Sequence, residues 1–384
     1  MTAPTWLERG VLIVGGGIAG LTLAGALQRI GVNCQLAERS DTWAPVGAGI
    51  ILGVNAMAVM RRFDLAHDLE DQAWALEGMT ITDAKNRHLI RTNLAELRPR
   101  FGISLALHRA VLHEALLSAA RDVPIRMGTT VDSLEETGES VRARFSDGSE
   151  DSFALVVGAD GLHSQIRSLI FGDVPLRYSG YTCWRMVVES DEMEASAQEM
   201  WGRGKRFGAV HIDAQRIYCF AVVNAEAGRP DPAPGRLQRL RQQFSEFAGP
   251  VPSLLASLKE PDQLIQNDLY EVLHTPWYRG RVVLVGDAAH GMTPDMGQGA
   301  AMALEDIAVL IESLETTDSP ADALGAWATR RTARVRWIQN QSRRIGQVGQ
   351  WESRLACALR NQVTRATPAW AATRVLKALA SQRV

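Results

Sequence analysis

The sequence contains few cysteines, and they are not arranged for a metal site, a redox dithiol or a disulfide framework. The four cysteines among 384 residues are scattered and show no C-x-x-C spacing: Cys34, Cys183, Cys219 and Cys357. Scattered cysteines of this kind are typical of a reducing compartment. We therefore expect no bound metal and a cytoplasmic location.

The sequence also lacks the pattern of a signal peptide. The first ten residues, M-T-A-P-T-W-L-E-R-G, contain no basic segment followed by an apolar one. Residues 11–30 are fairly apolar and about as long as a membrane helix, but they include five glycines. This glycine content favours a strand followed by a helix over a membrane span.

Neither sign of charge is in large excess overall, but the charge is unevenly distributed. The net charge is −2, and 46% hydrophobic with 22% charged residues is typical of a soluble globular protein. From Thr329 to the end there are twelve Arg or Lys and a single acid, Glu352, a local charge of +11 that leaves −13 for the rest. Such a tail can bind nucleic acid or an anionic membrane, or its arginines can face solvent and pair with acids of the body. We favour the latter and expect neither a nucleic-acid partner nor membrane contact.

The most informative stretch is residues 11–20, V-L-I-V-G-G-G-I-A-G. Four apolar residues of a predicted buried strand lead into Gly15, Gly17 and Gly20, and this G-x-G-x-x-G spacing precedes a helix-forming segment. The first glycine permits a tight turn, the second lets the backbone approach a pyrophosphate, and the third allows close helix packing. A second predicted strand ends in Glu38, a carboxylate placed for a ribose hydroxyl. These residues predict a bound dinucleotide without distinguishing FAD from a nicotinamide.

Two further predicted strands end in an aspartate. Residues 154–157 lead into Gly158-Ala159-Asp160-Gly161, and residues 282–285 lead into Gly286-Asp287. Either could be only a turn, but two such strand ends in one chain indicate parts of the same ligand site. Residues 293–299, T-P-D-M-G-Q-G, then precede a strong predicted helix at 300–314.

The middle of the chain has a different sequence pattern from the segments on either side. Between residue 178 and about residue 266, short alternating segments predict an antiparallel sheet inserted into a parallel α/β domain. A hairpin is predicted from segments 79–82 and 89–92. Helices are predicted at 107–120, at 235–258 with a break at Pro250 and Pro252, and from 321 onward with breaks at Gly346 and Pro368.

These motifs, in this order, resemble the single-component FAD-dependent monooxygenases of the aromatic hydroxylase type, with the p-hydroxybenzoate hydroxylase fold. The resemblance covers roughly residues 10–345. It rests on the glycine fingerprint with Glu38, on Asp160-Gly161 with His163, Ser164 and Arg167, and on Gly286-Asp287 with Pro294 and Gly297-Gln298-Gly299.

The resemblance implies an α/β fold, in which a Rossmann-like FAD-binding domain carries an inserted antiparallel β-sheet substrate domain and a C-terminal helical segment. The expected FAD-binding parts are residues 1–75, 97–175 and 274–330. A hairpin at 76–96 and the sheet at 176–273 would form the substrate-binding part, and the C-terminal helices would cover 331–384.

The resemblance also implies FAD as the cofactor. Glu38 would bind the adenosine ribose, Arg109 would contact FAD, and Asp287 would hold its ribityl-pyrophosphate portion. Residues 294–299 would run beside the isoalloxazine. Many relatives have a polar residue after G-Q-G, whereas this chain has Ala300 and Ala301, so only backbone contacts are expected there. The full predicted set is Gly15, Gly17, Ile18, Ala19, Gly20, Glu38, Arg39, Gly49, Arg109, Val131, Asp160, Asp287, Pro294, Gly297, Gln298, Gly299 and Ala300.

Two of these residues have a plainer interpretation as well, and a third is associated with two cofactors. Arg109 could be a solvated residue in the first turn of a helix. Gly49 could be a turn glycine in the loop at 45–50. Asp160 is associated with both FAD and NAD(P)H in relatives.

By the same resemblance, NADH or NADPH reduces FAD, molecular oxygen adds at flavin C4a, and the hydroperoxide hydroxylates an electron-rich ring. A second G-x-G-x-x-G is missing from the sequence, which disfavours a separate NADPH domain. The nicotinamide is therefore expected to bind transiently. The missing dithiol disfavours disulfide reductases.

Residues 201–207, W-G-R-G-K-R-F, together with Tyr218 resemble the urate hydroxylase and zeaxanthin epoxidase branch. In urate hydroxylases an Arg and a Tyr matching Arg206 and Tyr218 bind and activate the substrate, so these two are the predicted catalytic residues. The alternatives are a strand arginine paired with an acid and a half-buried core tyrosine. Cys183 aligns with a polar Asn of urate hydroxylases, which argues against urate. Further pocket candidates are His211 and Trp184.

Three functions remain open at this point. The leading one is hydroxylation of a small aromatic or heteroaromatic substrate. The second is epoxidation or hydroxylation of a larger polyketide, quinolone or terpenoid. The third is a flavin-binding interaction protein whose basic C-terminal helices dock a membrane or a partner. The sequence does not distinguish NADH from NADPH and does not determine the oligomeric state.

Overall fold

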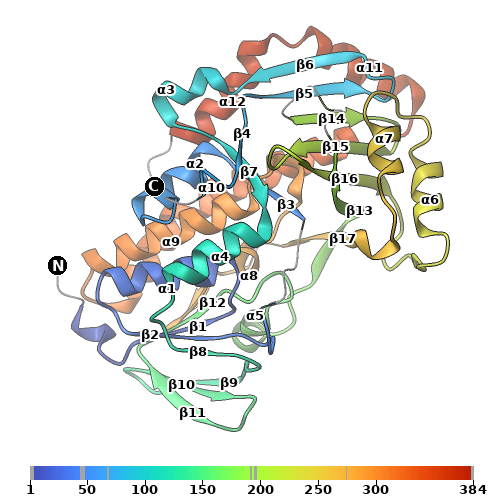
Figure 1. Cartoon of the computed structure of the whole chain (residues 1–384). Helices are drawn as coiled ribbons and strands as arrows, with labels where there is room; N and C mark the ends of the chain where they lie inside the picture. Colours follow the sequence, from blue (N-terminus) through green and yellow to red (C-terminus); the bar gives the residue numbers. More distant parts are fainter. Residues whose placement is uncertain are drawn as a thin grey trace.

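Two sheets, bridged by long helices, organise the structure (Figure 1). The computed structural model describes residues 4–43, 48–66, 69–190, 193, 197–273 and 275–381. Residues 45–47 of the predicted loop at 45–50 lie outside the described residues.

The glycine fingerprint belongs to a six-stranded, mainly parallel sheet. All four residues of β1 (Val11–Val14) are buried, and β1 pairs in parallel with strands on both sides. A continuous run of Val, Leu and Ile suits a strand that is covered on both faces. The strand order is β18 (Tyr278–Arg279), β19 (Val282–Leu284), β12 (Leu155–Gly158), β1, β2 (Cys34–Ala37) and β8 (Ile125–Arg126).

Five of these strands run parallel and β18 pairs antiparallel with β19. Parallel strands have their carboxyl ends at the same edge of a sheet, which is where α/β proteins bind ligands. Gly15, Glu38, Asp160 and Asp287 all follow such strand ends. The fold therefore brings the predicted cofactor residues to one edge.

Helices pack around this sheet and share its hydrophobic core. The core includes most apolar residues of the sheet strands together with buried side chains of the surrounding helices. These helices are α1 (Ile18–Arg29), α2 (Val54–Arg62), α4 (Arg109–Ala119), α5 (Gln165–Phe171), α8 (Asp287–His290), α9 (Gly299–Thr316) and α10 (Pro320–Gly349).

A seven-stranded sheet forms the second part of the molecule. Its strand order is β17 (Ile265–Val272), β13 (Leu176–Glu189), β16 (Arg216–Asn224), β15 (Lys205–His211), β14 (Ala197–Trp201), β5 (Gly78–Asp83) and β6 (His88–Asn93). The β5–β6 pair confirms the predicted hairpin. Neighbouring strands are antiparallel except for β14 and β5.

The two faces of this sheet have different partners. On one face, Phe207, Cys219 and Ala221 pack under α6 (Arg236–Gln243) and α7 (Val251–Ala256). Side chains alternate along a strand, so Arg206 and Tyr218 lie on the other face, which contacts the segment before α9 and the strand β3 (Gly49–Leu52).

Smaller elements complete the described fold. One three-stranded meander comprises β9 (Val131–Glu136), β10 (Val141–Phe145) and β11 (Glu150–Phe153), and a second small sheet comprises β3 (Gly49–Leu52), β7 (Leu105–His108) and β4 (Trp74–Ala75). The remaining short helices are α3 (Arg98–Phe101) and the 3-10 turns η1 (Thr5–Leu7), η2 (Ala95–Leu97), η3 (Pro261–Gln263) and η4 (Pro294–Met296).

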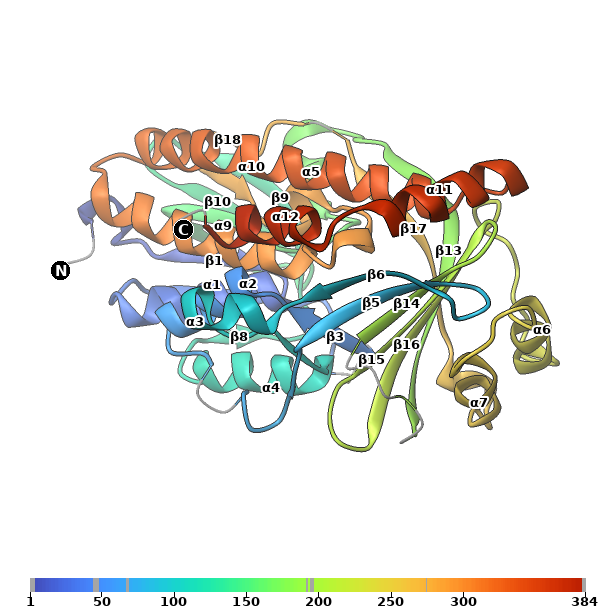
Figure 2. The same cartoon turned by 90° about the horizontal axis from the view of Figure 1, so that it is seen from above.

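Three helices end the chain. Figure 2 shows α10, α11 (Arg354–Ala366) and α12 (Ala369–Ser381) along the same side of the molecule, with α11 and α12 next to β6. Among the described residues, no helix is both long enough and apolar enough to cross a membrane.

Three predicted helix boundaries were wrong. Leu107 and His108 end strand β7, and the helix begins at Arg109 because His108 caps it through its ring nitrogen. The break predicted at Pro250 and Pro252 in segment 235–258 begins earlier, because α6 ends at Gln243, and Pro252 lies in the first turn of α7. Gly346 does not break the C-terminal helix, because α10 continues to Gly349.

Candidate functional site

The turn between β1 and α1 leaves no room for side chains at its first and third glycines. Gly15 has a φ of +109°, and a Cβ there would lie 2.5 Å from the carbonyl oxygen of Ala159. A Cβ at Gly20 would overlap the carbonyl oxygen of Gly15. These two glycines are therefore required by the close approach of strand, turn and helix.

The second glycine of the turn faces open space. A Cβ at Gly17 would meet no described atom within 4 Å. Gly17 is also the N-cap of α1, and within the described chain no side chain caps this helix. The first turn, which begins with Ile18 and Ala19, thus has backbone N–H groups available for an external anion such as a pyrophosphate.

Glu38 lies directly beside this turn. Its carboxylate accepts hydrogen bonds from the backbone N–H groups of Gly16 at 2.7 Å and Ser40 at 2.9 Å. The carbonyl of Glu38 accepts from the backbone of Thr129 at 2.9 Å, which brings the start of β9 to the same edge. Arg39 is exposed. Val131 is fully buried, and its contact with FAD stays a prediction.

The side chain of Asp160 caps a helix. Its carboxylate accepts hydrogen bonds from the Ser164 hydroxyl at 2.5 Å and from the backbone N–H groups of Gln165 at 2.7 Å and Ile166 at 3.0 Å. These contacts fix the N-terminus of α5. The Cα of Asp160 would lie 2.9 Å from a Cβ at Gly15, so its backbone lines the glycine turn while its carboxylate points into α5.

Asp287 and Arg109 act on one another across the same edge. The Asp287 side chain is exposed, yet the protein around it desolvates the carboxyl and raises its pKa, while the charges of His290 and Arg109 oppose this shift. Arg109 opens α4, and its backbone N–H donates to the carbonyl of Ala48 at 2.9 Å. An exposed carboxylate can accept hydrogen bonds from the hydroxyl groups of a ligand, and the exposed arginine nearby suits an anionic group of that ligand.

The segment before α9 presents backbone to open space. Gly297, which follows η4, has a φ of +62°, and a Cβ there or at Gly299 would meet no atom of the described residues within 4 Å. Pro294 is exposed, and within the described chain α9 has no side-chain cap. The N–H groups and the positive dipole end at Gly299 and Ala300 can therefore stabilise negative charge on a ligand.

Gln298 is oriented away from this space. Its side chain is buried, and its amide oxygen accepts a hydrogen bond from Asn55 at 3.0 Å. Only its backbone is available to a ligand beside the segment.

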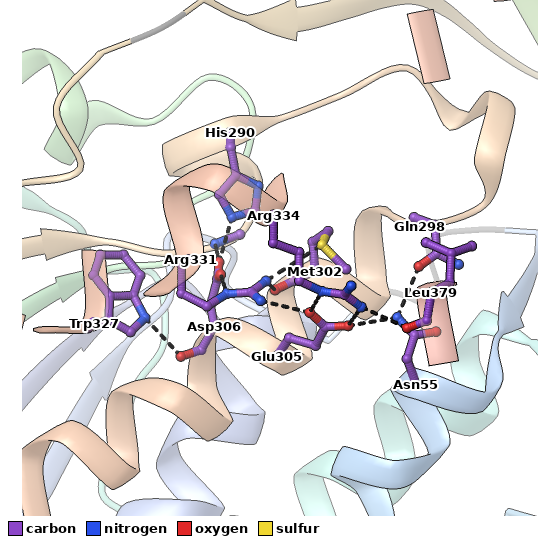
Figure 3. A network of polar contacts seen from close by, with 11 residues as sticks. Asn55, His290, Gln298, Met302, Glu305, Asp306, Trp327, Arg331, Arg334 and Leu379 are labelled. Carbon is purple, nitrogen blue, oxygen red and sulfur yellow. Dashed lines mark hydrogen bonds and ion pairs between the residues drawn. The ribbon is translucent and has the colours of Figure 1, made fainter. Parts of the chain in front are cut away.

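A buried network of charged residues lies beneath this segment (Figure 3). Glu305 and Asp306 are consecutive on α9 and have no exposed surface. Arg331 binds Glu305 at 2.7 Å and Asp306 at 2.8 Å, and Arg334 binds Glu305 at 2.5 Å. Each buried charge therefore has a partner of opposite sign, as burial requires.

The network contacts both the strand end at Gly286 and, through Asn55, the segment before α9. Asp306 accepts from the backbone N–H of Gly286 at 3.0 Å and pairs with His290 at 2.5 Å. Glu305 accepts from Asn55 at 2.8 Å, and the same Asn55 amide holds Gln298. The network thus fixes the strand end before Asp287 relative to the segment before α9.

Arg206 lies between two carboxylates. It is 2% exposed, and it pairs with Asp295 of η4, with Glu199 of β14 at 3.1 Å and with the Gln350 amide at 3.1 Å. Burial lowers the pKa of Arg206, but the charges of Asp295 and Glu199 outweigh burial and raise it. Its contacts are those of a strand arginine paired with acids, and its catalytic role stays a prediction.

Tyr218 is nearly buried on the same face of the sheet. It lies against Gly49, where a Cβ would overlap the tyrosine side chain, and its hydroxyl hydrogen-bonds Arg185. Gly49 therefore has a packing reason of its own, and its contact with FAD stays a prediction. His211 binds the carbonyl of Met193 at 2.9 Å, whereas Trp184 lies in the core under α6 and α7, on the opposite face from Tyr218.

Several residues of the site were not found from the sequence. These residues lie in two buried clusters of charged and polar side chains, one around Arg206 and one around Glu305 and Asp306. Asp295 lies within the predicted segment 294–299 but was not singled out; the others are Asn55, Tyr181, Glu199, Glu305, Asp306, Arg331, Arg334 and Gln350. One signal was present: Glu305 and Asp306 interrupt an otherwise apolar stretch of α9. Two adjacent acids in a helix that is buried all round need buried basic partners.

The residues at this edge fit an FAD. An uncapped helix start at Gly17 suits its pyrophosphate, Glu38 lies beside that turn, and the exposed Asp287 lies between the two halves of the site. The open backbone at Gly297 and Gly299 suits a flat ring system beside the start of α9.

Comparisons with known proteins agree with this fit. Residues 8–353 match the model of the FAD binding domain family. The chain is 38% identical over 362 residues to the 2-heptyl-3-hydroxy-4(1H)-quinolone synthase of Pseudomonas aeruginosa, covering 93% of this chain and 94% of the relative. It is 34% identical over 359 residues to the aurachin C monooxygenase/isomerase of Stigmatella aurantiaca, covering 92% and 93%.

A solved structure has a closely similar fold. The crystal structure of Klebsiella pneumoniae HpxO complexed with FAD and uric acid has a TM-score of 0.88 and 29% identity, and the match covers 97% of this chain and 96% of that chain. The predicted α/β fold with a C-terminal helical segment is confirmed, as is FAD as cofactor. The interpretation as a non-enzymatic binding protein is set aside. The chain belongs to the FAD binding domain family and is an FAD-dependent monooxygenase.

Proposed function

We propose that this enzyme uses NADH or NADPH and molecular oxygen to hydroxylate a heteroaromatic ring that carries an apolar substituent, with a 2-alkyl-4-quinolone as the test case. We favour a quinolone-type substrate over a small polar purine. The names of the quinolone synthase and the aurachin monooxygenase point in the same direction.

The observation that carries the proposal is an apolar surface around Phe220. The half-buried Phe220 ring covers Gly208, where any side chain would overlap it. It packs against the buried cluster of Cys183, Val222 and Leu269. A flat ring with an alkyl chain would bury apolar area here, whereas the Cys183 thiol of this cluster would offer a purine only weak hydrogen bonding.

This surface faces the segment before α9. Phe220 lies in the sheet between Arg185 and Gly208, on the same face as Arg206, which pairs with Asp295 of η4. A substrate on Phe220 would therefore lie between the sheet and the flavin-side backbone at residues 294–299.

Two polar groups beside Phe220 suit the ring oxygen of such a substrate. Arg185 and Tyr218 hydrogen-bond one another, and burial raises the pKa of Tyr218, so its hydroxyl stays protonated at neutral pH. We assign Tyr218 to orienting the ring oxygen and Arg185 to stabilising its enolate form, which enriches the neighbouring carbon in electrons.

Bound FAD would supply electron transfer from the nicotinamide to oxygen, one atom of which enters the substrate while the other leaves as water. The backbone N–H groups at Gly299 and Ala300 would stabilise negative charge at the flavin ring. We give Arg206 the role of a positioning residue, because its guanidinium bonds to Glu199 and Asp295 and does not face open space.

The test compares substrates on the FAD-loaded enzyme. We expect a 2-alkyl-4-quinolone to stimulate NAD(P)H oxidation at least about tenfold over urate and to gain one oxygen atom by mass spectrometry. Phe220→Ala should raise KM for the quinolone about tenfold, the equivalent of about 1.4 kcal/mol, and Phe220→Leu should raise it less. Preferential turnover of urate would overturn the proposal, and so would an unchanged KM in Phe220→Ala.

A further inference from the structure

We propose that helix α11 binds the surface of a membrane that contains anionic lipids. Three of its apolar side chains point into solvent: Leu355 is 83% exposed, Leu359 61% and Val363 58%. Their four-residue spacing places them in one row along the helix. We call this row, together with the exposed Trp351 before the helix and the exposed Trp370 at the start of α12, the α11 surface.

The inward side of the same helix carries Cys357 and Arg360. Arg360 is 3% exposed, and its guanidinium donates to the carbonyls of Gly349 and Gly202, both at 2.9 Å. It also lies over the Trp201 ring, 5.3 Å from the centroid. A surface helix ordinarily buries its leucines. α11 instead exposes Leu355 and Leu359 and buries Arg360, and an exposed apolar row of this kind marks a site of interaction.

Two exposed tryptophans flank α11 along the chain. Trp351 is 39% exposed and Trp370 is 65% exposed. An indole has an apolar body and one N–H donor, which suits the boundary between lipid headgroups and acyl chains.

The charge around the row selects the kind of surface. Arg354 and Arg365 are exposed and flank the row on one side, and α12 adds the exposed Arg374 and Lys377. Between residues 351 and 381 the sequence contains a single acid, Glu352. A helix with an exposed apolar row and basic flanks lies in the interface of a membrane, and basic side chains are attracted to anionic lipids.

The same charge disfavours a second copy of this chain as the partner. In a symmetric dimer each patch meets its own copy, so Arg354 and Arg365 of the two copies would lie close together. Like charges at an interface oppose association. An anionic bilayer covers the leucines and neutralises the arginines at once.

The arginines of the basic C-terminal region differ in their surroundings between α10 and α11. In α10, Arg331, Arg334 and Arg343 pair with acids of the body, as the sequence analysis expected. In α11 the pattern differs, and for this helix we replace the expectation of no membrane contact. Arg360 joins α11 to Gly202 and Trp201 beside the large sheet, so binding through α11 would hold the substrate-binding sheet close to the bilayer.

The test is vesicle flotation of the FAD-loaded, full-length enzyme. We expect at least about five times more enzyme with vesicles of phosphatidylcholine and phosphatidylglycerol at 7:3 than with phosphatidylcholine alone. About 0.5 M NaCl should reduce this binding, because salt screens exposed charges. The double variant Leu355→Glu/Leu359→Glu should reduce binding at least about fivefold. Leu169→Glu, an exposed leucine of α5, is the matched control and should bind as the wild type does.

A second variant and a second measurement distinguish the remaining outcomes. Arg354→Glu/Arg365→Glu should lose the preference for the anionic vesicles, and flavin absorbance should confirm that each variant keeps its cofactor. Wild-type enzyme that floats with neither vesicle, or equally with both, would overturn the proposal. Light scattering that shows a dimer broken by Leu355→Glu/Leu359→Glu, without vesicle binding, would overturn it in favour of a second copy.

Discussion

At the scale of single residues, Arg206 joins parts of the molecule that are distant in the chain. Its guanidinium is buried between Glu199 of the large sheet and Asp295 of η4, and Tyr181 donates to the same Asp295 at 2.7 Å. Burial raises the pKa of Glu199, and the nearby Asp295 adds to the shift although Arg206 opposes it. The two carboxylates therefore depend on the arginine between them.

Replacing this arginine tests its positioning role. Arg206→Met leaves Glu199 and Asp295 without their shared cation, which we expect to lower the free energy of unfolding by about 3–5 kcal/mol. FAD should stay bound, while the ratio of product formed to NAD(P)H consumed should fall, because Asp295 no longer holds the segment beside the flavin. Arg203→Met, at an exposed neighbouring arginine, is the control. Normal coupled turnover in Arg206→Met would remove Arg206 from the mechanism.

At the scale of elements, α10 connects the two sheets through close backbone contacts. Gly346 lies against Asp295 and Tyr181, where a Cβ would overlap both side chains. A Cβ at Gly349 would lie 2.7 Å from Cδ of Arg206. A Cβ at Gly325, in the same helix, would lie 3.7 Å from the hydroxyl oxygen of Tyr278, which is an ordinary contact distance. Two glycines of α10 thus allow it to approach the Arg206 cluster, whereas Gly325 has space.

These glycines predict opposite effects of one substitution within a single helix. Gly325→Ala should stabilise the protein by up to about 1 kcal/mol, because alanine favours helix and fits the space. Gly346→Ala should instead destabilise it by about 1–3 kcal/mol, because the methyl group overpacks the cluster. Denaturant unfolding measures both variants, and flavin fluorescence reports on the segment before α9. Equal stabilisation by both substitutions would contradict the packing argument.

At the scale of the whole molecule, the buried charges on α9 and α10 tie the cofactor edge to the C-terminal helices. Arg334 reaches from Glu305 to the carbonyl of Leu379 in α12 at 2.9 Å. Asp306 is buried, which raises its pKa, but the charges of His290 and Arg331 outweigh burial and hold the pKa below its ordinary value. The carboxylate of Asp306 is therefore more acidic in the folded state than in the unfolded one.

This difference predicts part of the acid sensitivity of the enzyme. With a depressed folded pKa, Asp306 stabilises the fold above its ordinary pKa of 3.8, and the stabilisation is lost as the pH falls from there through the folded value. Asp306→Asn should lower the free energy of unfolding at pH 7 by about 3–5 kcal/mol and make it fall less steeply toward pH 3. Denaturant titrations between pH 7 and 3 measure this slope, with the exposed Asp322→Asn as control. A slope in Asp306→Asn equal to that of the wild type would contradict the assignment.

Patterns in the sequence predicted the residues at the cofactor edge. The glycine spacing at Gly15, Gly17 and Gly20 is a pattern of a few residues, and Glu38, Asp160 and Asp287 each follow a short strand, so these residues can be recognised without knowledge of the fold. The same local rules indicated the hairpin and the inserted sheet, since strand alternation is visible within six to nine residues. These signals predicted a dinucleotide site, and the family resemblance that they support implied the fold and FAD as the cofactor.

The partners of the buried charges could not be predicted from the sequence, because the fold brings them together. The pairs of Arg206 with Asp295 and of Arg331 with Asp306 join residues 89 and 25 positions apart, and sequence spacing carries no information about such partners. The structure also showed that α11 exposes its leucines and buries Arg360. A helical pattern marks two faces of a helix but does not say which one packs inward, because that choice depends on the neighbouring elements that the fold places beside it.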